Sequence, residues 1–111
     1  MIRHIARTTL ILGSLLAAAA GWAADTTFNL SLKDHKFTPA ELTIPANTKV
    51  KLVVKNLDAT PAEFESDDFK AEKVIPPGKE ATLFIGPLKP GKYEFHDEYH
   101  EAVSKTYLIA K

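Results

Sequence analysis

Short apolar–polar alternations, separated by turn residues, run along most of this chain and constrain its fold more than any other feature. Over residues 49–56, Val50, Leu52 and Val54 alternate with positions of which most are lysines, a pattern typical of a strand with one buried face. Asparagine, proline and glycine separate the runs at the spacing expected of an all-β sandwich. The pattern predicts strands at 26–32, 41–45, 49–56, 62–66, 71–75, 80–85, 92–96 and 106–110.

These runs predict one all-β domain, a Greek-key β-sandwich of about seven to eight strands, over residues 24–111. No run predicts a helix longer than a turn or two, and no internal repeat or linker divides the segment. A domain of this size can bury a single core but has a modest stability margin.

The first 23 residues have the pattern of a secretory signal peptide. Two arginines precede an apolar run over residues 10–20, and small residues stand just before a cleavage site after Ala23. The run is short for a membrane span. We therefore expect residues 1–23 to be removed and residues 24–111 to be exported to the periplasm; the alternative is an uncleaved membrane anchor.

The chain contains no cysteine, and its single methionine and tryptophan are Met1 and Trp22, both inside the predicted signal peptide. The exported domain therefore cannot rely on disulfides, and a bound metal could add to the stability that packing provides. It also lacks both sulfur ligands of a blue-copper site.

The formal net charge is zero, but the charges are unevenly distributed. Residues 62–69 and 93–104 together hold eight acids, two histidines and no lysine, whereas the rest of the domain holds twelve lysines and six acids. If the two acidic segments meet, they form a negative pole that attracts cations and repels nucleic acid. No glycine-rich phosphate-binding motif is present.

Metal-ligand side chains recur in the acidic segments. Along a strand Tyr93, Phe95 and Asp97 share one face, so Asp97 falls where the apolar face reaches its end. Glu98 and His100 are separated by one residue, as are the two glutamates of the other segment, and in an extended chain each pair could point the same way. Carboxylate and imidazole ligands suit iron, Cu(II), zinc or manganese rather than Cu(I).

Two further histidines are weaker candidates. His96 shares strand parity with Glu94, away from the apolar face, so we expect it to be an exposed or rim residue rather than a group that contacts the metal. His35 follows the first strand and would ordinarily be structural. A solvated acidic surface without a metal is the alternative for every one of these residues. The candidate metal ligands are His100, Glu98, Asp97, Glu63, Glu65, His35 and His96.

Residues 34–41, 56–61, 63–66 and 86–95 resemble the cysteine-free cupredoxin-like proteins encoded with bacterial periplasmic iron-uptake systems, the EfeO-type cupredoxin-like domain family. In ordinary cupredoxins the strand that matches residues 93–97 ends in cysteine and is followed by histidine and methionine. Here Asp97 takes the cysteine position, His100 takes the histidine position, and Val103 or Ser104 lies near the methionine position.

The resemblance implies a cupredoxin-like fold over residues 24–111 and a bound iron or copper ion, Cu(II) or Fe(II)/Fe(III). It also raises His35 as a ligand, and implies a function in iron uptake beside an inner-membrane iron permease or another periplasmic iron-transport component. Copper-based electron transfer with non-blue ligands and a metal-free docking module are the alternatives. We expect a binding protein rather than an enzyme, with assistance to ferrous iron oxidation as an open possibility; the sequence does not give the oligomeric state.

Overall fold

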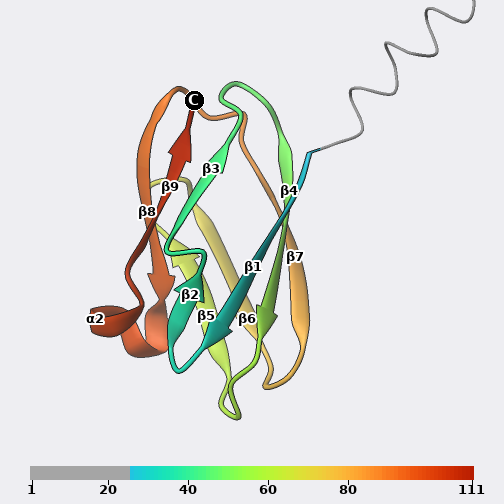
Figure 1. The fold of residues 1–111 in the computed structure, drawn as a ribbon, viewed down its shortest axis with the longest axis vertical. Helices are drawn as coiled ribbons and strands as arrows, with labels where there is room; N and C mark the ends of the chain where they lie inside the picture. Colours follow the sequence, from blue (N-terminus) through green and yellow to red (C-terminus); the bar gives the residue numbers. More distant parts are fainter. Residues whose placement is uncertain (1–25) are drawn as a thin grey trace, which may run out of the picture.

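Nine strands form two sheets in the computed structural model, which describes residues 26–111 (Figure 1). One sheet has the order β2-β1-β4-β7 and the other the order β3-β9-β8-β5-β6. The strands are β1 (Thr27–Lys33), β2 (Lys36–Thr38), β3 (Glu41–Ile44), β4 (Val50–Asn56), β5 (Ala62–Ser66), β6 (Ala71–Ile75), β7 (Glu80–Ile85), β8 (Gly91–Asp97) and β9 (Thr106–Ala110).

The predicted all-β sandwich is confirmed, with one strand more than expected. Strand β2 escaped prediction because three residues are too few to show alternation. The strands β1 and β4, like β3 and β9, pair in parallel, and the other neighbours pair antiparallel. The predicted signal peptide, residues 1–23, lies outside the described residues.

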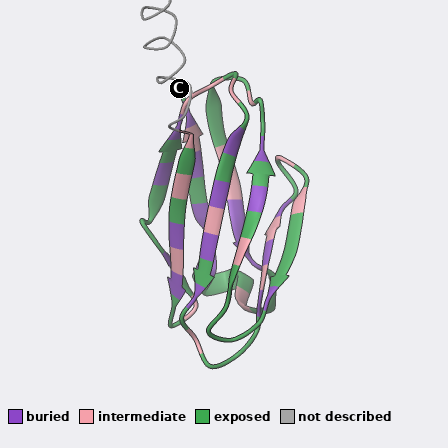
Figure 2. Cartoon of the chain, turned by 90° about the vertical axis from the view of Figure 1, so that its right-hand side faces the viewer, coloured by how far each residue is buried: buried purple, intermediate pink, exposed green. Residues whose placement is uncertain are grey.

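Inward-facing side chains of both sheets pack into one hydrophobic core. The buried and exposed positions alternate along the strands (Figure 2). Three phenylalanines form the centre of one end of this core. The Phe95 ring stacks on Phe64 and meets Phe37 edge-on, each at a centroid distance of 5.1 Å. Burying one such ring contributes about 1.5–3 kcal/mol. These rings fix β2, β5 and β8 against one another.

The aromatic core also positions the candidate ligands. Phe37 lies two residues after His35, and Phe95 lies two residues before Asp97. After Asp97 the chain leaves the sheet through the 3₁₀ turn η1 (Glu98–His100) and the one-turn helix α2 (Glu101–Ser104). Within residues 26–111 no helix is long and apolar enough to cross a bilayer.

Candidate metal centre

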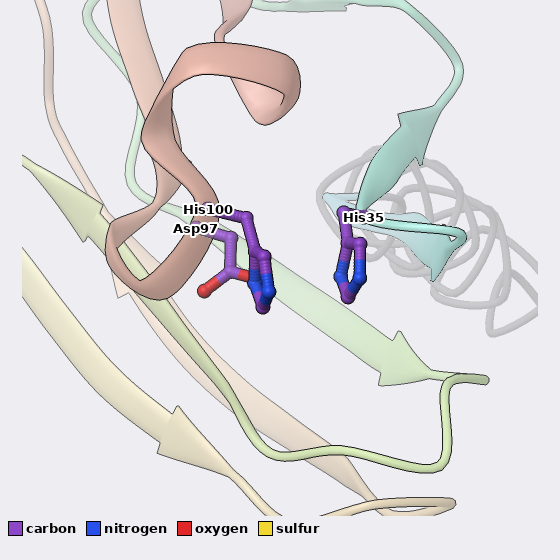
Figure 3. Close-up of side chains that lie close together, drawn as sticks. All are labelled: His35, Asp97 and His100. Carbon is purple, nitrogen blue, oxygen red and sulfur yellow. The ribbon is translucent and has the colours of Figure 1, made fainter.

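Two histidines and a buried aspartate meet at one end of the sandwich (Figure 3). His35 comes from the turn between β1 and β2, whereas Asp97 and His100 come from the end of β8 and from η1. The two imidazole rings lie face to face, with centroids 3.6 Å apart and planes inclined by 13°. One ligand atom of each of the three residues lies within 4.8 Å of the others. The predicted candidates His35, Asp97 and His100 are thus brought together.

A tight turn of unusual backbone conformation carries His35. Asp34 and His35 have φ angles of 52° and 62°, in the left-handed region that two-residue hairpins prefer but side chains disfavour. The Asp58 carboxylate accepts hydrogen bonds from both backbone N–H groups, at 2.6 Å from Asp34 and 3.0 Å from His35. Burial alone would raise the pKa of Asp58, but these donors and the nearby His35 and Lys33 lower it below its usual value.

Asp97 organises the turn that carries His100. Its side chain is almost wholly buried, at 1% exposed, and its Oδ1 accepts hydrogen bonds from the backbone N–H groups of Glu63 (2.9 Å) and Tyr99 (3.1 Å). Its backbone N–H donates to the Ser104 hydroxyl at 2.8 Å, which fixes α2 against β8. A carboxylate can remain ionised in a buried place only when such donors replace water.

Each imidazole has one nitrogen beside a carboxylate and one that is open. Nδ1 of His100 lies 3.2 Å from Asp97 Oδ2, and Nδ1 of His35 lies 3.5 Å from Asp58 Oδ2. Over residues 26–111, neither Nε2 has a hydrogen-bond partner from the protein. About a third of each side chain is exposed, 34% for His35 and 35% for His100. Both Nε2 atoms are therefore free of hydrogen bonds from the described part of the protein, on side chains that are partly exposed.

His96 is buried, at 3% exposed, so the prediction of an exposed side chain is wrong. Its side chain does point away from the aromatic core, but Glu94 and Glu98 cover it, with Oε2 of Glu94 2.7 Å from Nδ1 and Oε1 of Glu98 2.8 Å from Nε2. Burial alone would lower the pKa of His96, but these two hydrogen bonds raise it above its usual value. An imidazolium that donates to both glutamates explains the burial, and a metal there would have to displace one of them.

Three glutamates crowd the outer face of β5 and β6. Glu65 lies opposite Glu72 in the antiparallel pair, and Glu63 lies nearby. A shared hydrogen bond with Glu72, then burial and like-charge repulsion, raise the pKa of Glu63. Burial, followed by repulsion from Glu98 and Glu72, raises the pKa of Glu65. A cation placed between these carboxylates would relieve their repulsion.

The expectation that Glu98 and His100 point the same way is wrong, because residues 98–100 form a 3₁₀ turn rather than an extended segment. Residues two apart on a 3₁₀ turn project in different directions. Glu98 joins Glu65 and His96, whereas His100 faces His35. Glu63 and Glu65 do lie together, as predicted.

Two acids that belong to this region, Glu72 and Asp58, are not among the ligands predicted from the sequence. Glu72 follows from the β5–β6 hairpin, in which a short turn sets residue 72 opposite residue 65. Asp58 follows an Asx turn made by Asn56, whose side-chain oxygen accepts the Asp58 backbone N–H at 2.9 Å. Its contact with the His35 turn spans 23 residues, and no local pattern could reveal it.

Comparisons with known proteins agree with this architecture. The sequence model of the cupredoxin-like domain family matches residues 6–110. An uncharacterized protein of Rickettsia prowazekii (strain Madrid E) is 39% identical over 80 residues, which cover 72% of this chain and 64% of that protein. The match therefore spans less than two thirds of that relative's length.

Two solved structures show a similar fold at low sequence identity. A copper binding protein in the apo form, solved by NMR, aligns with a TM-score of 0.66 and 17% identity, covering 77% of this chain and 86% of that one. Auracyanin A, a blue copper protein from Chloroflexus aurantiacus, aligns with a TM-score of 0.65 and 14% identity, covering 77% of this chain and 98% of its own.

Proposed function

This chain belongs to the cupredoxin-like domain family, and we propose that it is an exported protein that binds a metal ion through His35 and His100. The stacked histidine pair carries the proposal, because each ring leaves Nε2 open while a carboxylate holds the Nδ1 side. Metal-binding histidines commonly have this arrangement, in which the second nitrogen donates to a carboxylate that orients the ring. Asp97 is either that orienting group or a third ligand.

The donor set decides which metals fit. The chain has no cysteine, so a thiolate-bound blue-copper centre does not fit it, although the two copper proteins compared above have a similar fold. Imidazole nitrogens with carboxylate oxygens fit Cu(II) and iron, which are the ions we propose. A histidine nitrogen binds a metal in the plane of its ring, and the two planes here are nearly parallel. Binding of one ion by both rings therefore requires a side-chain rotation that opens the stack.

We place this binding in iron uptake, beside an inner-membrane iron permease or another periplasmic iron-transport component. The signal-peptide pattern of residues 1–23 and the resemblance to cysteine-free cupredoxin-like proteins of iron-uptake systems support this placement. A strain that lacks the gene should grow poorly at low iron, and the intact gene should restore growth. Restoration by a gene that carries both His35→Ala and His100→Ala would count against a metal-dependent role.

Electron transfer through a non-blue copper ion is a second candidate. Tyr99 and Val103, on either side of His100 in the sequence, are 51% and 55% exposed. Apolar side chains of this kind near a metal ligand could seat a redox partner. Reversible one-electron reduction of the copper-loaded protein would favour this function over transport. If no ion binds, a metal-free module that docks through its acidic surface is the remaining function.

Calorimetry with Cu(II), Fe(II), Zn(II) and Mn(II) tests the binding itself. We expect one tight site for at least one of these ions, lost in His35→Ala and His100→Ala. Glu80→Gln, at an exposed position on β7 and outside the candidate metal-ligand clusters of residues 26–111, serves as the control and should bind as the unaltered protein does. Dissociation constants above about 1 mM for all four ions, equivalent to less than about 4 kcal/mol of binding, would contradict the proposal.

A further inference from the structure

Asp58 joins the loop between β4 and β5 to the turn that presents His35. Its two carboxylate oxygens accept the backbone N–H groups of both residues in that turn, Oδ1 from Asp34 and Oδ2 from His35. The same Oδ2 lies 3.5 Å from Nδ1 of the His35 ring. Asp58 therefore contacts both the backbone and the side chain of His35.

A hydrogen bond to a buried residue, Asn56, holds Asp58 in place. Its backbone N–H donates to Oδ1 of Asn56, and Asn56 is fully buried. Nδ2 of Asn56 donates to the carbonyl oxygens of Thr60 (2.9 Å), in the same loop as Asp58, and of Ile75 (3.0 Å), in β6. This chain of hydrogen bonds connects the His35 turn to the second sheet, which carries His100.

The turn needs such support because neither of its residues is glycine. Asp34 and His35 both have positive φ angles, which side chains disfavour, and aspartate tolerates them better than histidine does. Without an acceptor for its two N–H groups, the turn would be free to relax to another conformation. The His35 ring would then leave its position 3.6 Å from His100.

We infer that Asp58 is a positioning residue for the metal site: its carboxylate holds the left-handed Asp34–His35 turn so that the His35 ring faces His100. This inference rests on the proposed function only for its consequence in metal binding. The placement of the ring can be tested without any metal.

The test compares Asp58→Asn with Asp34→Asn. The Asp58→Asn side chain keeps one oxygen acceptor and turns an N–H₂ group toward the second backbone donor, so the turn loses a hydrogen bond. Asp34→Asn removes the same charge one residue from His35, and the Asp34 side chain makes no hydrogen bond with residues 26–111. Asparagine also tolerates a positive φ. The pair thus separates the geometric effect from the loss of charge.

Two measurements give the outcome. By NMR without metal, the nuclear Overhauser contacts between the His35 and His100 rings should persist in Asp34→Asn and disappear in Asp58→Asn. By calorimetry, Cu(II) affinity should fall at least about tenfold in Asp58→Asn, as is usual for a group that orients a ligand, and less in Asp34→Asn. Thermal melts of both variants show whether the fold is intact. If Asp58→Asn melts early, the double variant Asp34→Gly with Asp58→Asn, in which glycine relaxes the turn, is compared with Asp34→Gly.

Ring contacts that persist in Asp58→Asn would overturn the inference, as would equal affinity losses in the two aspartate variants. A failure of the proposed function has a different signature. The unaltered protein would then bind none of the four ions tested by calorimetry, or would bind them equally well after His35→Ala, whatever the NMR contacts show.

Discussion

Replacing Asp97 with alanine should destabilise the protein far more than replacing it with asparagine. The carboxylate accepts the backbone N–H groups of Glu63 and Tyr99, and alanine leaves both without an acceptor. Each unsatisfied donor costs about 1–3 kcal/mol. Relief of a buried charge offsets part of the loss, so we expect a net destabilisation of about 3 kcal/mol, or about 12–24 °C in Tm for a domain of this size.

Asparagine retains the amide oxygen for both N–H groups and loses only the charged contact with His100, so Asp97→Asn should lose about 1 kcal/mol. The assay is urea unfolding followed by circular dichroism at pH 7 with a chelator present. Asp67→Ala, which removes an exposed carboxylate, is the control and should stay within about 0.5 kcal/mol of the unaltered protein. Equal losses for Asp97→Ala and Asp97→Asn would show that the negative charge, not the hydrogen bonds, holds the turn.

Three further predictions concern His96, Glu72 and Phe64. Hydrogen bonds to glutamates raise the pKa of His96 above 6.5 in the folded state. The protonated side chain therefore stabilises the folded protein fully below pH 6.5, and this contribution is lost as the pH rises through the folded-state pKa. Urea midpoints of the unaltered protein and His96→Gln should therefore differ most on the acidic side; a constant difference would exclude an imidazolium. The raised pKa of Glu63 means that its ionised form is disfavoured in the folded protein, so repulsion from Glu72 destabilises the fold as the pH rises above 4.5. Glu72→Gln should therefore raise the urea midpoint at pH 7 and not at pH 4. Phe64→Ala should remove about 3–5 kcal/mol by leaving a cavity in the aromatic core, and a loss under 1 kcal/mol would mean that this core repacks freely.

Most of the fold could be predicted from the sequence because a strand with one buried face has a local pattern of alternating apolar and polar residues. Val50, Leu52 and Val54 are buried as their alternation predicts, and the same parity correctly places Phe95 and Asp97 inward. The segment Glu98–Ser104 has no such pattern, since seven residues without apolar periodicity are compatible with loop, 3₁₀ turn or helix.

The candidate site was less predictable because its geometry depends on contacts between distant segments. His96 is buried on the outward face through charge compensation by Glu94 and Glu98, which parity alone cannot show. His35 and His100 are 65 positions apart, and only the packing of the β1–β2 turn against η1 brings their rings together. The acidic composition indicated a cation-binding region, but it did not separate the histidine pair from the glutamate cluster.

Pulsed electron paramagnetic resonance of the protein loaded with one equivalent of Cu(II) detects the imidazoles bound to the ion, and so tests whether His35 and His100 bind it. We expect two coordinated imidazoles in the unaltered protein and in a folded His96→Gln. We expect one in each of the variants His35→Ala and His100→Ala. A spectrum without imidazole coupling, or coupling that neither alanine variant changes, would contradict a metal site at the stacked histidines.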